Sequence, residues 1–309
     1  MTPRAASSPR PLLLLGAAGQ LGRELQLALA PLGTVHAFDL PQLDITDAPA
    51  VRALIERLEP AAIVNAAAYT AVDRAEADEA LATRVNAHAV AVLAEAARVH
   101  GMPLVHYSTD YVFDGSVDRP YTPDDAPNPL SAYGRSKLAG ERAIFAAQAP
   151  ALILRTSWVF GRHGGNFVRT ILRAARTRDS LRVVDDQIGQ PTPAALLAGV
   201  TALLLQRVLA QSLPLTGPAL HHVAASGAVS WHAFACAIVE QAQALGIGLR
   251  TSIDRIAAIP ASEYPVPARR PANSRLDTSR LESAFGLTMP AWMPYLIDVL
   301  EHFRHDDAP

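Results

Sequence analysis

The sequence predicts an α/β fold: a doubly wound parallel sheet followed by a smaller α/β part. Two observations support this prediction. From residue 11 to residue 156, short apolar runs alternate with helical patterns, and helices of this length between strands imply parallel pairing with right-handed crossovers. After residue 156 the pattern becomes less regular and richer in proline. The chain of 309 residues is long enough for two such parts.

Each strand of the first part is predicted from a short apolar run, and each helix from the apolar spacing between two runs. The predicted strands are Pro11–Leu15, Thr34–Asp39, Ala61–Ala66, Pro103–Ser108 and Ala151–Thr156. The predicted helices are Gly19–Ala30, Ala48–Leu58, Glu79–His100 and Tyr133–Ala147. Residues 1–10 precede them without periodicity, so we expect a disordered tail there.

The second part contains fewer clear elements. Its predicted helices are Asn166–Arg176, Pro193–Leu209 and Ser230–Leu245, and its predicted strand is Ala219–Ala224. The stretch Ile259–Pro271 is rich in proline and is therefore predicted to be extended or looped. No low-complexity linker separates the two parts, so we expect them to pack tightly with a cleft between them.

Charge and cysteine content exclude several classes of protein. Basic and acidic residues number 27 and 29, so no basic excess is available to hold a nucleic-acid backbone or an anionic membrane. The single cysteine, Cys236, rules out an intrachain disulfide, and no Cys/His cluster has zinc-site spacing. The apolar run Leu12–Leu15 is too short for a signal peptide or a membrane span. We therefore expect a cytoplasmic protein.

A glycine loop joins the first predicted strand to the first predicted helix. Gly16, Gly19 and Gly22 have the spacing G-x-x-G-x-x-G, with Gln20 beside the second glycine. Such a loop allows a tight turn and a close approach of the backbone to a pyrophosphate, as in Rossmann-type dinucleotide-binding folds. Asp39 ends the next strand, where a carboxylate can bind ribose hydroxyls. Because no arginine follows it, the sequence favours NADH slightly and leaves NADPH open.

Two further segments are predicted to line a cofactor. Asp44 and Ile45 follow the second strand, near the expected position of an adenine ring. Ala66, Ala67 and Ala68 end the third strand, where small side chains let the backbone touch a cofactor that crosses the sheet.

The strongest candidate for catalysis is a tyrosine followed four residues later by a lysine. Of the 27 basic residues only Lys137 is a lysine, and Tyr133 precedes it by one helical turn. A nearby ammonium favours the phenolate form of a tyrosine, which can then exchange a proton with a ketone oxygen as hydride reaches the carbon. Ser108 or Thr109, at the end of the fourth strand, can hydrogen-bond the same oxygen.

These motifs resemble the extended branch of the short-chain dehydrogenase/reductase superfamily, and most closely its dTDP-4-dehydrorhamnose reductase family. The similar segments are Asn65–Glu76, Tyr107–Asp114, Tyr133–Glu141, Arg155–Gly161, Asp186–Thr192 and Arg269–Leu276. The resemblance extends from about Leu12 to Trp292. It implies NADH- or NADPH-dependent reduction of the C4 ketone of a dTDP-sugar, the last step of dTDP-L-rhamnose synthesis. It also implies that residues 11–156 bind the cofactor and that residues 157–309 mainly bind the sugar nucleotide.

The resemblance also implies roles for single residues. Tyr133 would donate the proton, Lys137 would tune its pKa and anchor the nicotinamide ribose, and Thr109 would polarise the ketone. The remaining cofactor contacts would be Gly16, Gly19, Gln20, Leu21, Gly22, Asp39, Asp44, Ile45, Ala66, Ala67, Ala68 and Tyr107. The substrate contacts would be Thr109, Asp110 and Trp158, with Asn273, Ser274 and Arg275 as weaker candidates for the nucleotide end.

Some family members form dimers with Mg²⁺ at a glutamate-rich interface, and Glu24 matches one such position. One carboxylate is thin support for a hard cation, so the metal and the homodimer stay open. An epimerase or a non-catalytic regulatory subunit on the same fold are the alternatives. A dehydratase would need Thr-Asp-Glu, whereas here Tyr111 follows Thr109 and Asp110.

Overall fold

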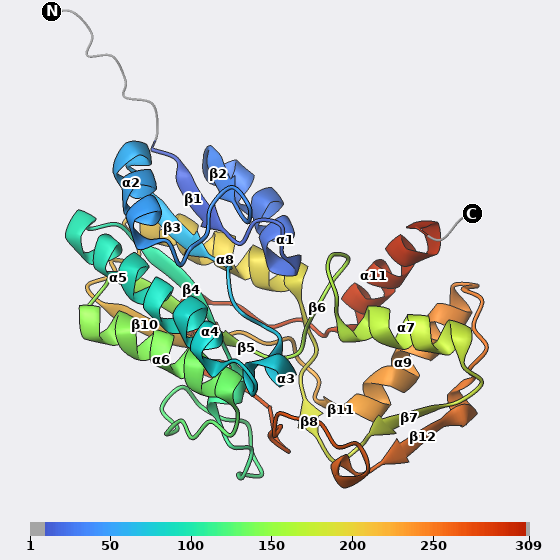
Figure 1. The fold of residues 1–309 in the computed structure, drawn as a ribbon. Coiled ribbons are helices and arrows are strands. Elements are labelled where there is room, and N and C mark those ends of the chain that lie inside the picture. Colours follow the sequence, from blue (N-terminus) through green and yellow to red (C-terminus); the bar gives the residue numbers. More distant parts are fainter. Residues whose placement is uncertain (1–9, 307–309) are drawn as a thin grey trace, which may run out of the picture.

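A computed structural model describes residues 10–306 of the chain. Residues 1–9 of the predicted tail lie outside this range. Arg10 lies within it and is held, because its guanidinium donates hydrogen bonds to the carbonyl oxygens of Glu59 and Pro60. Figure 1 shows a sheet covered by helices on both faces, with a smaller group of helices and short strands beside it.

The central sheet has six parallel strands in the order β10-β5-β4-β3-β1-β2. The strands are β1 (Leu12–Leu15), β2 (Val35–Phe38), β3 (Ala62–Asn65), β4 (Leu104–Thr109), β5 (Ala151–Thr156) and β10 (Pro218–His222). The order reverses between β1 and β3, and ligands of doubly wound sheets bind at the carboxyl ends of strands at such a point. The predicted doubly wound parallel sheet is confirmed.

Two hydrophobic clusters cover the two faces of the sheet. Leu12 and Leu14 pack with α1 (Gln20–Leu29) and α8 (Ala194–Leu209) on one face. Leu13 and Leu15 pack with residues of three helices on the other face. These helices are α2 (Ala48–Leu58), α5 (Ala89–His100) and α6 (Ala132–Ala147). Because successive side chains of a strand point to opposite faces, an uninterrupted apolar run is required here.

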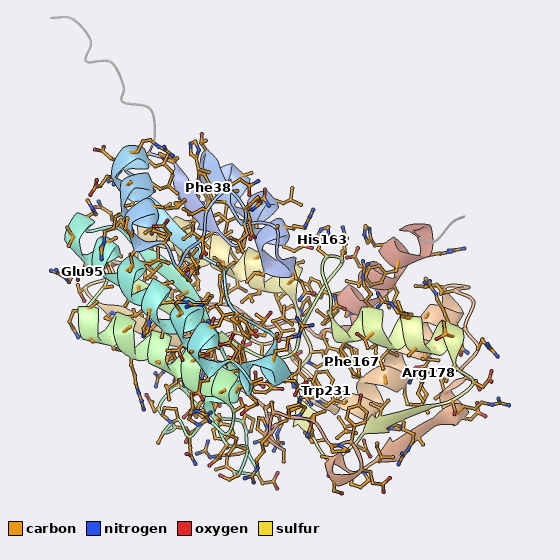
Figure 2. All side chains as sticks on the ribbon, viewed as in Figure 1. Phe38, Glu95, His163, Phe167, Arg178 and Trp231 are labelled. Carbon is orange, nitrogen blue, oxygen red and sulfur yellow. The ribbon has the colours of Figure 1, made fainter. Side chains whose placement is uncertain are left out.

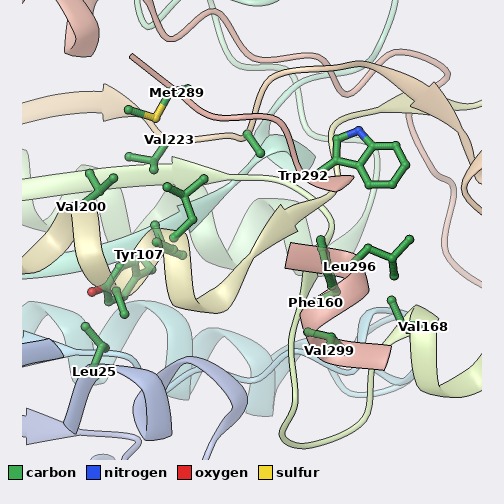
Figure 3. Packing of buried hydrophobic residues seen from close by; sticks show 14 of the residues in the cluster. Leu25, Tyr107, Phe160, Val168, Val200, Val223, Met289, Trp292, Leu296 and Val299 are labelled. Carbon is green, nitrogen blue, oxygen red and sulfur yellow. The ribbon is translucent and has the colours of Figure 1, made fainter. Parts of the chain in front are cut away.

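The smaller part is built around a continuation of the first cluster. It contains α7 (Phe167–Thr177), α9 (Trp231–Ala244) and α11 (Met293–Asp306), with β7 (Leu181–Val184) paired to β12 (Ile256–Ile259). Short strand pairs join β6 (Val159–Phe160) to β9 (Thr192–Pro193), and β8 (Ile188–Gly189) to β11 (Val229–Ser230). Figure 3 shows the shared core, in which Tyr107 and Leu25 of the large part and Phe160 and Trp292 of the small part belong to one cluster.

One predicted helix is interrupted. The stretch Glu79–His100 is not a single helix but α4 (Glu79–Thr83), a π-helical turn (Arg84–His88) and α5. The wide turn places Asn86 against α6, where its amide donates to the hydroxyl of Ser136 and to the carbonyl of Tyr69. Apolar periodicity does not reveal this turn, because it depends on a polar contact with another helix.

Several short elements of the second part were not predicted. They are the short strands β6 to β9, β11 and β12 and the helix α10 (Ser279–Phe285). The longer helix α11 of the second part and the helix α3 (Val72–Ala75) of the first part were not predicted either. Strands of two residues carry too little periodicity to be detected from sequence. None of the helices in residues 10–306 is both long enough and apolar enough to cross a membrane.

Phe234 tests the importance of the shared core. Its ring is fully buried and lies 5.6, 5.5 and 5.3 Å from the rings of Phe160, Phe167 and Trp292. We expect Phe234→Ala to lower the free energy of unfolding by about 3–5 kcal/mol in urea titrations, because it leaves a cavity. The control Phe145→Ala, at a 40% exposed site, should cost less than about 1 kcal/mol. Equal losses would contradict this account.

Candidate active site

The glycine loop forms a cradle at the reversal point of the sheet. A Cβ atom on Gly16 would lie 2.4 Å from the amide nitrogen of Ala67, and the φ angle of Gly16 is +79°. A Cβ on Gly22 would lie 2.0 Å from the carbonyl oxygen of Gly16. Side chains at these positions are therefore excluded, and the ends of β1 and β3 lie against each other. The structure thus brings the predicted residues Gly16, Ala66 and Ala67 together.

The predicted residues after β2 hold the local backbone. The carboxylate of Asp39 accepts hydrogen bonds from the amides of Ala18 and Leu40, both at 2.8 Å. Asp44 accepts the amide and hydroxyl of Thr46, and these hydrogen bonds lower the pKa of its carboxyl group. The Asp39 contact joins the end of β2 to the glycine loop, so the carboxylate fixes the shape of the cradle.

Other predicted cofactor residues contact neighbouring elements. The amide of Gln20 donates to the carbonyl of Val159 and accepts from Asn166, so it ties the start of α1 to the smaller part. The phenol of Tyr107 lies 2.8 Å from the hydroxyl of Thr201 in α8, and burial raises its pKa. Leu21, Ile45 and Ala68 form no side-chain hydrogen bond, as their chemistry requires. Leu21 packs on the first cluster and Ile45 belongs to the second.

Two buried polar residues lie at the end of β4, since Thr109 is its last residue and Asp110 begins the turn that follows. The hydroxyl of Thr109 donates to Asp110 at 2.9 Å and accepts the amide of Tyr111 at 3.1 Å. Burial raises the pKa of Asp110 to about 6, although hydrogen bonds from Ser274 and Thr109 oppose the rise. The Asp110 carboxyl group therefore titrates close to neutral pH.

Tyr133 lies in the first turn of α6 and faces this end of β4. The hydroxyl of Ser131 caps the helix by accepting the amide of Gly134 at 3.2 Å. A Cβ on Gly134 would lie 2.2 Å from the carbonyl oxygen of Tyr111, so only glycine lets the helix start so close to the turn that follows β4. Burial and the charge of Asp110 raise the pKa of the Tyr133 phenol, and a hydrogen bond with Thr109 opposes the rise.

Lys137 is buried one turn further along α6. Its Nζ lies 3.3 Å from Nε2 of His106 in β4. Burial lowers its pKa to about 8, and the charge of Glu141 opposes the fall. The sequence led us to expect that Lys137 would lower the pKa of Tyr133. In the structure that pKa is raised, because burial and Asp110 dominate and Lys137 contacts His106.

Of the three residues predicted to contact the nucleotide end of the substrate, two use their polar atoms for contacts within the protein. Asn273 donates to the carbonyl oxygens of Val117 and Arg119, both at 2.7 Å, and its amide oxygen accepts from Arg275. Arg275 also pairs with Asp118 at 3.0 Å. These two residues hold the loop after β4. Ser274, in contrast, is buried and reaches Asp110.

Trp158 has a strained backbone and a fixed ring. Its φ angle is +46°, which a non-glycine residue rarely adopts. Its ring stacks on that of Trp231, with centroids 3.4 Å apart and planes 8° apart, and a Cβ on Gly189 would lie 2.3 Å from the ring. Figure 2 places Trp231 beside Phe167, whose centroid is 4.5 Å away. Strain of this kind is found at ligand sites when the surroundings enforce it.

Glu24 belongs to no metal-ligating group in the described part of the chain. The charges near it include those of Arg162 and His163, and Arg162 pairs with Asp298 at 2.5 Å. Within residues 10–306 no three His, Cys, Asp or Glu side chains are grouped so that they could hold a metal ion. The residues of a single chain therefore do not fit Mg²⁺ at this position.

Sequence reasoning did not single out three buried polar residues near the site. They are His106, Asn86 and Arg155, and the last of these pairs with Glu141. His106 carried a usable signal, because it alternates with apolar Val105 in a buried strand and so points to the face that α6 covers.

Comparisons with known proteins identify the family. The family model described as "RmlD substrate binding domain" matches residues 10–305. A dTDP-4-dehydrorhamnose reductase of Shigella flexneri is 44% identical over 285 residues, which cover 91% of this chain and 94% of that protein. One of Burkholderia thailandensis is 44% identical over 282 residues, which cover 91% and 95%.

A solved structure extends the similarity to three dimensions. The dTDP-4-dehydrorhamnose reductase of Bacillus anthracis, solved in complex with NADP, has a TM-score of 0.83 and 33% identity. The match covers 96% of this chain and 99% of that one. Sequence and fold agree over nearly the whole chain. The chain therefore belongs to the dTDP-4-dehydrorhamnose reductase family of oxidoreductases, as its motifs predict.

Proposed function

We propose that this chain reduces the C4 ketone of dTDP-4-dehydro-L-rhamnose to dTDP-L-rhamnose with NADPH or NADH. The observation that carries the proposal is the arrangement at the end of β4. There, Thr109 and Asp110 are buried beside Tyr133 of α6, and the glycine cradle occupies the reversal point of the same sheet edge. A proton donor, a polarising hydroxyl and a pyrophosphate cradle are the groups that such a reduction needs.

The cradle fits a dinucleotide. Backbone contacts at Gly16 and Gly22 leave no room for a side chain, and Gly19 precedes the first turn of α1 without a side-chain cap. Free amides at a helix start bind phosphate groups. When bound there, a nicotinamide cofactor would supply the hydride that the ketone carbon needs. Asp39 and Asp44 would face its adenosine end, where no arginine adjoins Asp39 to select a 2′-phosphate.

Tyr133 supplies the proton in this proposal. A raised phenol pKa keeps the proton on the oxygen before reaction, which suits a residue that donates rather than accepts. Thr109 would donate a hydrogen bond to the same ketone oxygen and so stabilise the charge that develops on it. Lys137 lies on the same face of α6 as Tyr133 and would stabilise the phenolate left behind.

Residues 157–309 would hold most of the sugar nucleotide. Trp158 offers an aromatic ring to the sugar, and Ser274 lies next to Asp110 at the same site. Asn273 and Arg275 would act by shaping the loop after β4, since their polar atoms already bind it. A cytoplasmic location and a homodimer belong to this proposal.

A spectrophotometric assay tests the function. Purified protein should oxidise NADPH or NADH when dTDP-4-dehydro-L-rhamnose is added, and Tyr133→Phe should lose about 10²–10⁴-fold in turnover because the proton donor is gone. Cofactor affinity should change little, since the ring is kept. If the wild-type protein oxidises neither cofactor, the chain is not a reductase. If Tyr133→Phe keeps full turnover, another group supplies the proton.

Lys137→Arg tests whether the role of the lysine is local. The chain uses arginine for every other basic side chain, so charge alone would be preserved. A planar guanidinium is larger than an ammonium and cannot occupy the same buried position. We expect cofactor binding to weaken and kcat to fall about 10²-fold, as for a misplaced reactant. Circular dichroism should show a folded protein. Unchanged kcat and cofactor affinity would show that Lys137 contributes only its positive charge and has no local role.

Asp110→Asn tests the buried carboxyl group through pH. Because burial raises its pKa to about 6 from 3.8, the folded protein binds this proton more tightly than the unfolded chain. Ionisation therefore removes stability as the pH rises from about 4 to 6, and the loss persists above pH 6. The unfolding free energy of Asp110→Asn relative to wild type should rise by about 2–3 kcal/mol across that range.

The matched control is Asp179→Asn, at an exposed carboxylate. Because its ion pair with Arg250 lies at the surface and such pairs contribute little, its unfolding free energy relative to wild type should change far less between pH 4 and pH 8 than that of Asp110→Asn. An equally small change for Asp110→Asn would contradict the assignment of a buried, easily protonated carboxyl group.

A further inference from the structure

Lys137 is the end of a buried line of three polar side chains. Asn65 of β3, His106 of β4 and Lys137 of α6 are 1%, 0% and 2% exposed. The distance from Asn65 Nδ2 to His106 Nδ1 is 3.2 Å, and that from His106 Nε2 to Lys137 Nζ is 3.3 Å. Neither Asn65 nor His106 has a part in the reaction described so far.

The hydrogen bonds of Asn65 determine where the imidazole carries its proton. The amide oxygen of Asn65 accepts the backbone N–H of Ala67 at 3.2 Å, so the amide nitrogen faces His106. That nitrogen can only donate, and Nδ1 of His106 must therefore accept. Burial holds the pKa of His106 well below its usual value, and an ammonium at Lys137 would lower it further. The ring is thus neutral, with its hydrogen on Nε2.

This tautomer points an N–H group at Lys137. An ammonium has three donors and no acceptor, whereas a neutral amine has a lone pair. At 3.3 Å, the Nε2–H group of His106 can donate a hydrogen bond to Nζ when Nζ is a neutral amine. When Nζ is an ammonium, two donors face each other and no hydrogen bond forms. Glu141 acts in the other sense, because its charge favours the ammonium. Arg155 of β5 weakens that effect by pairing with Glu141 at 2.6 Å.

We propose that Asn65 and His106 form a positioning pair that holds Lys137 and controls whether its Nζ carries a proton. While Nζ has no other acceptor, the pair favours the amine, and Tyr133 keeps its proton. A ribose hydroxyl or a phenolate within reach of Nζ gives the ammonium an acceptor, and Nζ then takes up a proton from solvent. The effect of this protonation on the reduction rests on the proposed function. The control of Lys137 by His106 does not depend on that function.

The chain offers an unusually direct test, because Lys137 is its only lysine. Lysine labelled with ¹³C at Cε gives a single side-chain NMR signal from the whole protein, and its shift reports the protonation of Nζ. In the wild type we expect this signal to titrate well below the pH at which free lysine titrates. Added NADP⁺ should move the midpoint upward.

Two variants separate control by His106 from simple burial. In His106→Gln the amide oxygen can accept from the ammonium, so the Lys137 midpoint should rise by about one unit, a tenfold change in proton affinity. In Asn65→Asp the carboxylate accepts from Nδ1–H, so the ring hydrogen should move to Nδ1, as ¹⁵N spectra of the imidazole report. The Lys137 midpoint should rise here as well. His88→Gln, at an exposed site, is the control and should change neither signal.

The proposal is overturned if wild-type His106 carries its hydrogen on Nδ1. It is also overturned if the Lys137 midpoint is unchanged in every folded variant of His106 or Asn65. Because the titration needs no substrate, its outcome is independent of the reductase assay. A protein without reductase activity in which His106 controls Lys137 would contradict only the proposed function.

Discussion

The close packing of α6 on the end of β4 is the constraint on which the site depends. Two glycines make it possible by letting α6 approach the elements on either side of β4. A Cβ on Gly134 would lie 2.2 Å from the carbonyl oxygen of Tyr111, in the turn that follows β4, and one on Gly140 would lie 2.2 Å from the carbonyl oxygen of Asn86, in the π-helical turn. This approach buries Lys137 against β4 and brings Tyr133 to Thr109. The positions of the proposed acid and its lysine therefore follow from backbone contacts that only glycine permits.

Burying α6 in this way also buries charge. Glu141 and Arg155 are 2% and 3% exposed and form a two-point ion pair, in which Arg155 Nε and Nη2 lie 2.8 and 2.6 Å from the carboxylate oxygens. Removing such charges from water costs several kcal/mol each, which pairing largely offsets. The pair lies beside Lys137 and limits how far burial can lower the pKa of its amine. The stability of the packing around α6 and the proton affinity of Lys137 thus depend on the same contacts.

The doubly wound sheet, the glycine cradle and the position of Tyr133 one helical turn before Lys137 on α6 could be predicted from sequence, because each depends on local spacing. What could not be predicted depends on contacts between distant segments. The π-helical turn carries Asn86, whose amide donates a hydrogen bond to Ser136 of α6. Asn273 looked like a ligand residue, yet its amide holds the loop after β4. The raised pKa of Tyr133 depends on burial beside Asp110, which no residue spacing reveals.

A crystal structure of the protein with NADP⁺ and dTDP-L-rhamnose would test the central claim most directly. The claim is that the Tyr133 phenol and the Thr109 hydroxyl both donate hydrogen bonds to the C4 oxygen of the sugar. We predict that the Tyr133 phenol oxygen and the Thr109 hydroxyl each lie within about 2.6–3.2 Å of that oxygen, the range in which a proton can pass. A C4 oxygen beyond reach of Tyr133, with a different acidic group next to it, would contradict the account.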